Sequence, residues 1–362
     1  MEFGLSEDQR LLQDSVGRYL ADAAPLEQVR AGAEGDDTAT AAIEAGLREL
    51  GVQQILIPED QGGLGLGLLD AALVQEMLGR HVAPVAFTAA AGMAVAGLRA
   101  AGRDAQQNAW LPRIADGSVR LAAAVSERAG RREATGIAAA DGRLTGTALF
   151  ALDSAAASHA LVADRDGGLH IAALDSDGVR LEALTTIDRT RPIAALHFDG
   201  AAAEALDGEN APGAGADAML RVGRVLLAAD TLGAAQAMLE QAVSYAGERK
   251  QFGRLIGSFQ AVKHLCAEMA ARLEPCRALV WHAGHAHDAL PDEAPLLACL
   301  AKSHLAEVGQ FVARTATEVH GGMGFTDLLG LHYWFKRIGV NRQWLGGPER
   351  LRAEAARLQG WA

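Results

Sequence analysis

The 362-residue sequence has few cysteines and no long hydrophobic run. Only Cys266, Cys276 and Cys299 occur, in alanine-rich segments without metal-ligand spacing, so we expect reduced, buried thiols and a cytoplasmic location. No apolar stretch reaches the roughly 18 residues that a membrane-spanning helix needs. The start of the chain is charged and lacks an apolar segment, so we expect no signal peptide.

Positive charge is also in short supply. The chain has 33 Lys and Arg against 45 Asp and Glu, a formal net charge of −12. We therefore expect neither nucleic acid nor an anionic membrane as the main partner, and a phosphate-bearing ligand must be held by local arginines. His282, His285 and His287 lie together in a polar, helical segment, but the ligand set is incomplete, so no metal site is predicted.

Half of the residues are hydrophobic, which suffices for a sizeable core, and the length favours more than one domain. Helical periodicity fills the first part of the chain, beginning with a capping box formed by Ser6 and Gln9. Short alternating strands follow, with a hairpin turn at Asp141-Gly142. Long apolar helices return from about residue 213. We predict an α+β fold with domains at 1–116 (helical), 117–212 (β) and 213–362 (helical bundle).

Four segments, in this order, resemble the acyl-CoA dehydrogenase family across nearly the whole chain. They are FGLSEDQRLLQDSV, ILIPEDQGGLGLGLLDAALVQEMLGR, YAGERKQFGRLIGSFQAVKHLCAEMA and EVHGGMGFTD. The resemblance implies a barrel-like middle β domain and a C-terminal four-helix bundle. It also implies an FAD cofactor bound between subunits and an acyl-CoA thioester as substrate.

The same resemblance assigns six residues to the FAD of a neighbouring subunit: Arg249, Gln251, Phe252, Gln260, Gly321 and Gly322. Arginine suits this task because its fixed donors pair with phosphate oxygens. Gln260 would contact the adenosine end, and the two glycines would let backbone approach. Taken singly, Arg249 also reads as a solvated helix charge and Phe252 as a core residue.

Several positions that bind a subunit's own flavin in the family carry unsuitable residues in this sequence. Ser126 fits the family's flavin strand, and Phe150 is an acceptable aromatic near the flavin. Leu152, however, stands where the family has a hydroxyl. Arg131 and Arg132 replace glycine and serine, and they read either as exposed loop charge or as contacts to CoA phosphates.

The catalytic carboxylate is missing from both places where the family keeps it. Leu345 replaces the glutamate of a Tyr-Glu-Gly-Thr segment, and Gly223 occupies the alternative position on the long helix. A base beside the α-carbon of the thioester is required to remove its proton. Arg224, next in sequence to Gly223, corresponds to an arginine close to the CoA chain, although a helix-surface charge is an equal alternative.

Asp230 is the remaining catalytic candidate, two helical turns beyond Gly223 on the same face. It lies in apolar sequence, where burial would raise its pKa towards a useful range. The alternative is a hydrogen bond between helices. Glu349 is close by, but Pro348-Glu349 is typical of a helix start.

The residues that reach a neighbour's flavin are largely kept, with the exception of Glu318, an acid where a neutral glutamine is common and where a phosphate would be close. Losses mainly on one side suggest a hetero-oligomer, because a partner can supply the intact half. We predict a subunit of an FAD-dependent acyl-CoA dehydrogenase, in an α2β2 assembly with a homologous subunit that supplies the base. The acyl chain would be bulky, of the steroid side-chain type. Two rivals remain: a homo-oligomer that uses Asp230, and a non-catalytic scaffold without flavin.

Overall fold

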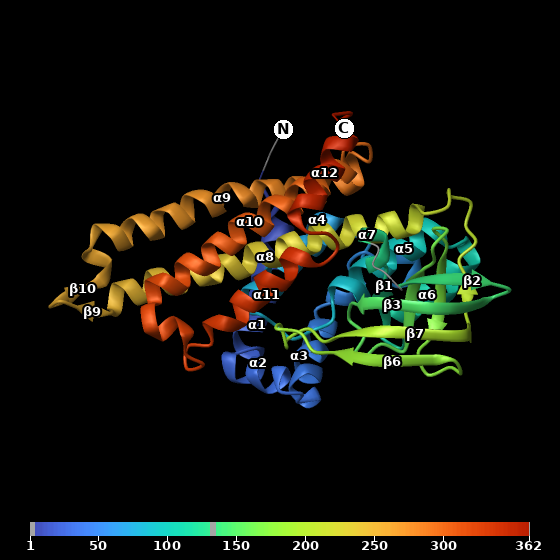
Figure 1. Ribbon diagram of the computed structural model, residues 1–362, viewed down its shortest axis with the longest axis horizontal. Helices are drawn as coiled ribbons and strands as arrows, with labels where there is room; N and C mark the ends of the chain where they lie inside the picture. The colour runs from blue at the N-terminus through green and yellow to red at the C-terminus, as the bar shows by residue number, and fades with distance from the viewer. Residues whose placement is uncertain (1–3, 131–134, 362) are drawn as a thin grey trace.

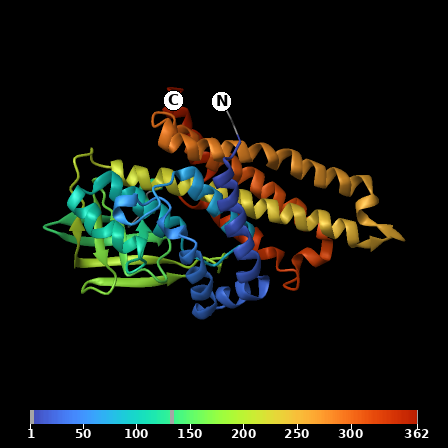
Figure 2. The same ribbon diagram turned by 180° about the vertical axis from the view of Figure 1, so that it is seen from behind.

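The computed structural model describes residues 4–130 and 135–361. The molecule is elongated, with two small sheets at one end and a long helical hairpin reaching out at the other (Figure 1). The N-terminal helices pack across the middle, behind the C-terminal bundle in this view and in front of it when the molecule is turned (Figure 2). Arg131 and Arg132 lie outside the described residues.

The first part of the chain is helical, as predicted. Ser6 and Gln9 form the expected capping box, each side chain accepting the backbone N–H of the other at 3.1 Å. The glycine-rich loop also has a steric cause, because a Cβ on Gly63 would lie 1.9 Å from the Ile57 carbonyl oxygen. The elements are α1 (Glu7–Ala23), α2 (Leu26–Ala33), α3 (Asp37–Glu49), η1 (Val52–Gln54), η2 (Glu59–Gln61), α4 (Leu68–Arg80), η3 (Thr88–Met93), α5 (Ala94–Ala101) and α6 (Asp104–Ala115).

The middle of the chain forms two four-stranded sheets. One has the order β1-β4-β5-β8, with β1 and β4 parallel, and the other has the order β2-β3-β7-β6 and is antiparallel. The predicted turn at Asp141-Gly142 connects β2 and β3, and both residues have positive φ. The elements are β1 (Leu121–Ala124), α7 (Ser126–Ala129), β2 (Gly136–Ala140), β3 (Arg143–Ala151), β4 (His159–Ala163), β5 (Leu169–Ala173), β6 (Val179–Leu184), β7 (Ile193–Ala202) and β8 (Glu204–Ala205).

The last part is the expected four-helix bundle, made of α8, α9, α10 and α11. A short hairpin, β9-β10, connects α8 to α9 at the far tip of the molecule (Figure 1). The elements are α8 (Ala214–Glu248), β9 (Lys250–Gln251), β10 (Arg254–Leu255), η4 (Ile256–Ser258), α9 (Gln260–Ala289), α10 (Ala294–His320), η5 (Gly321–Phe325), α11 (Leu331–Gln343) and α12 (Pro348–Leu358). The α+β fold is thus confirmed, while the domain boundaries stay a prediction.

Helix α8 is the axis of the molecule, because it packs against α4 and α5 of the N-terminal part as well as against the bundle. Its contact with α4 is close enough for backbones to touch. A Cβ on Gly233 would lie 1.8 Å from the Glu76 carbonyl oxygen, and one on Gly79 would lie 2.1 Å from the Asp230 carbonyl oxygen. No described helix is both long and apolar enough to cross a bilayer.

We predict that Gly233→Ala lowers the free energy of unfolding by roughly 1–3 kcal/mol, since the added methyl group forces α4 and α8 apart. The matched control is Gly247→Ala on the same helix, where a Cβ meets nothing within 4 Å. That change should be neutral or stabilising by up to about 1 kcal/mol, from helix propensity alone. Urea unfolding of both variants measures the difference, and equal effects would contradict the close contact.

Candidate flavin and thioester site

The residues expected to reach a neighbour's flavin lie together at the hairpin tip. Arg249 caps the C-terminal end of α8, Gln251 lies on β9, and Gln260 begins α9, all of them exposed. Phe252, in the turn, is 92% exposed and has φ +53°. An exposed aromatic in this backbone region is costly in water, which marks the tip as a contact surface.

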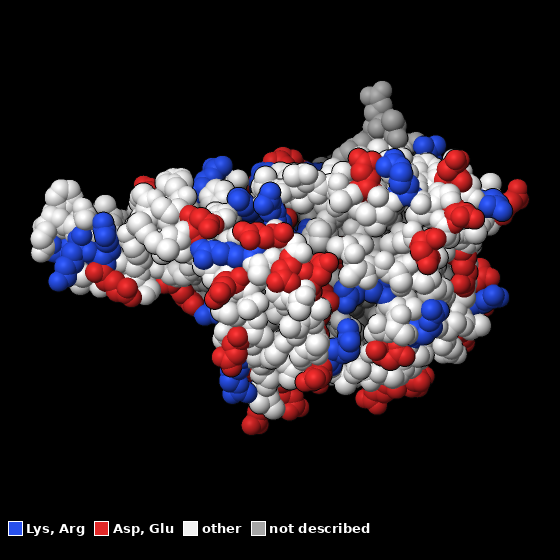
Figure 3. Space-filling view, turned by 90° about the horizontal axis from the view of Figure 1, so that it is seen from below, with Lys and Arg blue, Asp and Glu red and all other residues white. Residues whose placement is uncertain are grey.

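The tip is built from its own aromatic contacts. The Arg254 guanidinium lies over the Phe259 ring, 3.9 Å from its centre. The Phe252 and Phe259 rings pack edge to face, with 6.1 Å between their centres. Exposed basic residues here, Arg249, Lys250 and Arg254, supply local positive charge on an acidic protein. Figure 3 shows a group of basic side chains at this end, with acidic ones next to it, while side chains of both signs are spread over the rest of that face.

The two predicted glycines lie at the same end of the molecule. Tyr245 in the last turn of α8 stacks on His320 at 4.7 Å between ring centres, and Gly321 and Gly322 follow His320 directly. A Cβ on either glycine would meet nothing within 4 Å. The space that the resemblance requires for an approaching ligand is therefore present.

The residues expected at the subunit's own flavin lie at the other end. Ser126 Oγ donates a hydrogen bond to the Phe150 carbonyl oxygen at 3.2 Å, so the structure brings these two together. Leu152 is buried, and its backbone bridges the two sheets through Ala123. The hydroxyl of Ser126 is thus engaged within the chain, and hydrocarbon stands where the family has a second hydroxyl.

The residues expected at the chain's own flavin and those expected at a neighbour's flavin are too far apart to touch one flavin within one chain. Arg128, on α7 with Ser126, pairs with Asp217 in the first turn of α8, whereas Arg249 caps the last turn of α8. With a rise of 1.5 Å per residue, these 32 residues of helix span about 48 Å. The residues present therefore fit FAD as a group shared between two chains.

The two positions that the family uses for its base face each other across one small space. A Cβ on Gly223 would lie 2.5 Å from Leu345 Cδ1 and 2.7 Å from Met93 Sδ. Leu345 is buried, with φ +56°. Hydrocarbon thus fills the space between the two positions at which the sequence predicts that the base is missing.

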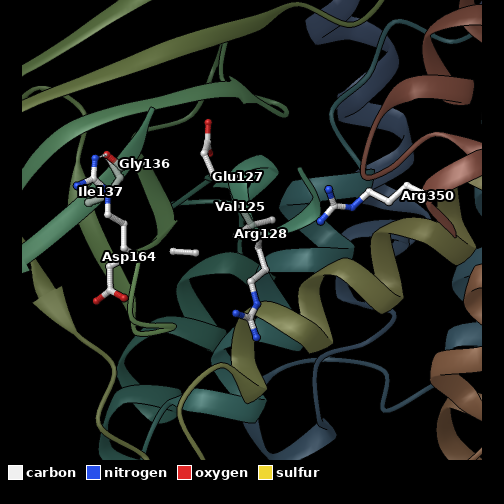
Figure 4. Close-up of a pocket in the computed structure, with 9 residues that line it drawn as sticks. Val125, Glu127, Arg128, Gly136, Ile137, Asp164 and Arg350 are labelled. Atoms are coloured by element: carbon white, nitrogen blue, oxygen red, sulfur yellow. Dashed lines mark hydrogen bonds between the residues drawn. The ribbon is translucent and has the colours of Figure 1, made fainter. Parts of the chain in front are cut away.

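Arginines line two adjoining cavities beside this point. Cavities of about 360 and 350 Å³ share Arg128 and Arg350, and Figure 4 shows both side chains extending toward the first from α7 and α12. Arg357 lines the second cavity, as does Arg224. Arg224 is buried, pairs with Glu354 at 2.7 and 2.9 Å, and donates to the Leu345 carbonyl oxygen at 3.1 Å. It is therefore not a helix-surface charge.

Asp230 is fully buried, but the expected rise in its pKa is wrong. Burial alone would raise the pKa, yet the charges of Arg337 and Arg191 outweigh burial and lower it to about 2. Arg337 donates to both carboxylate oxygens at 2.7–3.2 Å, and Asn341 and Gln75 donate at 2.7 and 2.8 Å. A carboxylate with these partners and this pKa is a buried counter-ion and is poorly suited to remove a proton.

Sequence reasoning missed the partners of Asp230. Arg337 and Asn341 lie one turn apart on α11, and Arg191 lies in the segment before β7. An aspartate in an apolar helix signalled that a partner exists. Which arginine supplies it depends on how α8 and α11 pack, and spacing in the sequence does not fix that packing.

Lys302 is a second buried charge that the sequence did not reveal. Its Nζ donates to the Asn341 carbonyl oxygen at 2.5 Å, and the side chain is 1% exposed. Burial, with the nearby charges of Arg224 and Arg342, lowers its pKa to about 7.

The described residues contain no cluster of potential metal ligands.

Comparison with known proteins agrees with this geometry. The family model for the acyl-CoA dehydrogenase N-terminal domain matches residues 6–118, and that for the C-terminal domain matches residues 214–358. Acyl-CoA dehydrogenase IpdE2 of Mycobacterium tuberculosis is 30% identical over 95% of each chain. The chain belongs to the acyl-CoA dehydrogenase family. It is an oxidoreductase of the class that acts on CH–CH bonds.

Two solved structures are especially informative. A variant of the Tcur3481-Tcur3483 steroid ACAD is 31% identical, with a TM-score of 0.86 and 98% of each chain covered. A chain of the ChsE4-ChsE5 complex from Mycobacterium tuberculosis superposes with a TM-score of 0.89 over the full length of both chains, at 24% identity. The second likeness shows the fold alone.

We predict that Lys302 makes stability depend on pH between about 7 and 10.5. Its folded pKa lies below the ordinary value of 10.5. The unfolded chain therefore binds more protons in this window, and stability rises with pH by up to about 1.4 kcal/mol per unit. Lys302→Met should remove that rise and stabilise the protein most below pH 7.

The measurement is urea unfolding at several pH values, taken as the difference between the wild type and Lys302→Met. Lys263→Met, at an exposed position of α9, controls for the loss of one lysine. A difference that stays constant from pH 6 to pH 10 would show that Lys302 does not change its charge in this window.

Proposed function

We propose that this chain is a subunit of an FAD-dependent acyl-CoA dehydrogenase that works in an α2β2 assembly with a homologous subunit. The observation that carries the proposal is the separation of the flavin residues. Those for a neighbour's flavin are intact at the hairpin tip, and those for the chain's own flavin are reduced at the opposite end. One-sided loss is tolerable only when the partner differs.

The comparisons support a partner subunit and a bulky substrate. The name of the Tcur3481-Tcur3483 steroid ACAD, to which this chain is 31% identical, contains two different chains. An acyl chain of that size needs room, and a subunit that gives up its own site provides it. A cytoplasmic location belongs to the same proposal, since Cys266, Cys276 and Cys299 are all unpaired.

The division of labour follows from the charges. Arg249 would neutralise the FAD pyrophosphate, and Phe252 and Gln251 would close over the cofactor from outside the partner. When bound, FAD supplies the acceptor for the β-hydride. Arg128, Arg350 and Arg357 would hold the phosphates of an acyl-CoA in the arginine-lined cavities. The partner's carboxylate would remove the α-proton.

The rival in which Asp230 is the base has lost its physical support. A base needs a free lone pair within reach of the substrate α-carbon. Both oxygens of Asp230 accept hydrogen bonds from buried side chains, and its side chain is 0% exposed. The remaining rival is a scaffold that carries no flavin.

Co-expression with the homologous subunit tests the proposal. We expect the purified chain alone to carry no flavin in stoichiometric amount and to oxidise no acyl-CoA. The co-purified complex should be yellow and reduce a dye with acyl-CoA. A complex without flavin would support the scaffold, and a yellow, active homo-oligomer would overturn the need for a partner.

Hairpin variants locate the contribution of this chain within the complex. Phe252→Ala and Arg249→Ala should lower flavin content or weaken flavin retention during gel filtration, because they remove the outer wall and one phosphate contact. Arg180→Ala, an exposed arginine of β6 at the opposite end, is the matched control. Equal flavin retention in all three variants would show that the tip does not meet the cofactor.

A further inference from the structure

A buried polar network joins four separated parts of the chain around Asp230. The carboxylate on α8 binds Arg337 and Asn341 of α11 and Gln75 of α4. Arg337 also donates to the carbonyl oxygen of Ala83, at 2.8 Å, and lies 3.3 Å from the hydroxyl of Thr190 before β7. One carboxylate therefore fixes the second half of α11 relative to three other segments.

The network continues from α11 to the loop that follows it. Asn341 Oδ1 accepts a hydrogen bond from Arg191 Nη2 at 2.7 Å, and Asp188 accepts two more from Arg191 at 2.9 and 3.1 Å. The Arg191 guanidinium then lies over the Trp344 ring, 4.7 Å from its centre. Trp344 is thus held by a cation whose own position is set by Asp188, by Asn341 and by a direct ion pair with Asp230, with 3.6 Å between Nη1 and Oδ1.

Trp344 opens the loop that fills the base position. The next residue, Leu345, is held by its side chain against Gly223 and by its carbonyl oxygen on Arg224. Its positive φ, followed by Gly346 with φ +110°, makes a sharp turn that packing must maintain. The conformation of this wall therefore depends on anchors at both ends: the Asp230 network before it and Arg224 after it.

We propose that Asp230 is a positioning residue: through Arg337 and Asn341 it sets the place of Arg191 on Trp344, and so the wall at Trp344, Leu345 and Gly346 beside the thioester site. The inference rests on the proposed function only in that this wall lines that site. The contacts of the buried Asp230 carboxylate, on which the inference is based, do not depend on the proposed function.

Charge balance explains why the carboxylate is needed. The network holds two anions, Asp188 and Asp230, against two cations, Arg191 and Arg337, all of them nearly inaccessible to water. Loss of the charge on Asp230 leaves Arg337 in the core without the counter-ion that it contacts, and a buried cation without such a partner moves toward water or toward another acceptor. Either movement displaces Asn341, which lies one turn further along α11.

The test follows the indole of Trp344 by fluorescence. We expect Asp230→Asn to raise the rate at which acrylamide quenches this tryptophan, because Arg191 leaves its face. Trp344→Phe provides the background: the increase should disappear when Asp230→Asn is made in that variant, which retains Trp110, Trp281, Trp334 and Trp361. The measurement uses the full chain and needs no partner, so it is separable from a failure of the proposed function.

Glu44→Gln is the matched control for loss of a buried ion pair. Glu44 pairs with Arg120 at 2.8 Å, contacts the backbone at Ala86 and lies outside the network. It should lower stability without changing the quenching of Trp344. If Asp230→Asn behaves in the same way, the pair only stabilises the fold and the positioning role is overturned.

A second variant keeps the question open to test if Asp230→Asn does not fold. Asn341→Ala leaves the contacts between Asp230 and Arg337 in place, and also the direct ion pair between Arg191 and Asp230, and removes only the hydrogen bond from Arg191 to Asn341. Increased quenching of Trp344 in this variant supports the relay, and unchanged quenching overturns it.

Discussion

The ion pair between Asp230 and Arg337 is the constraint on which the arrangement of this chain depends. It lies where α8, α4, α11 and the segment before β7 meet, and every oxygen of the carboxylate is in use. A buried pair of this kind adds little net stability compared with hydrocarbon, but it is satisfied in one arrangement only. The ion pair therefore contributes a specific arrangement of these segments, and through Asn341 and Arg191 it also fixes the loop after α11.

Two opposite surfaces follow from the long axis of α8. One end carries the sheets, Ser126 and the arginine-lined cavities, while the other carries an exposed hairpin with the residues proposed to contact a neighbour's FAD. The hydrocarbon at Leu345 and Gly223 lies between them. Under the proposed function, such a chain contributes to a shared site mainly through the residues that it presents to a neighbouring subunit.

Much of this could be predicted from the sequence. The capping box at Ser6, the turn at Asp141-Gly142 and the order of helices and strands follow local rules of periodicity and turn chemistry. The absence of a carboxylate at Leu345 and Gly223 is read from the sequence itself, and that the chain lacks a base stays a prediction. The environment of Asp230 could not, since its pKa depends on Arg337, which is 107 residues away in sequence. The same holds for Lys302, whose acceptor is a backbone oxygen of another helix.

The end of the molecule that carries the hairpin also exposes large apolar side chains to water. Phe252, Phe325 and Leu328 expose most of their side chains on the same end of the molecule. Surfaces of this kind associate with whatever apolar surface they meet first. Under the proposed function, a copy without its partner subunit is therefore at risk of aggregation, which favours balanced synthesis of the two chains and assembly soon after folding.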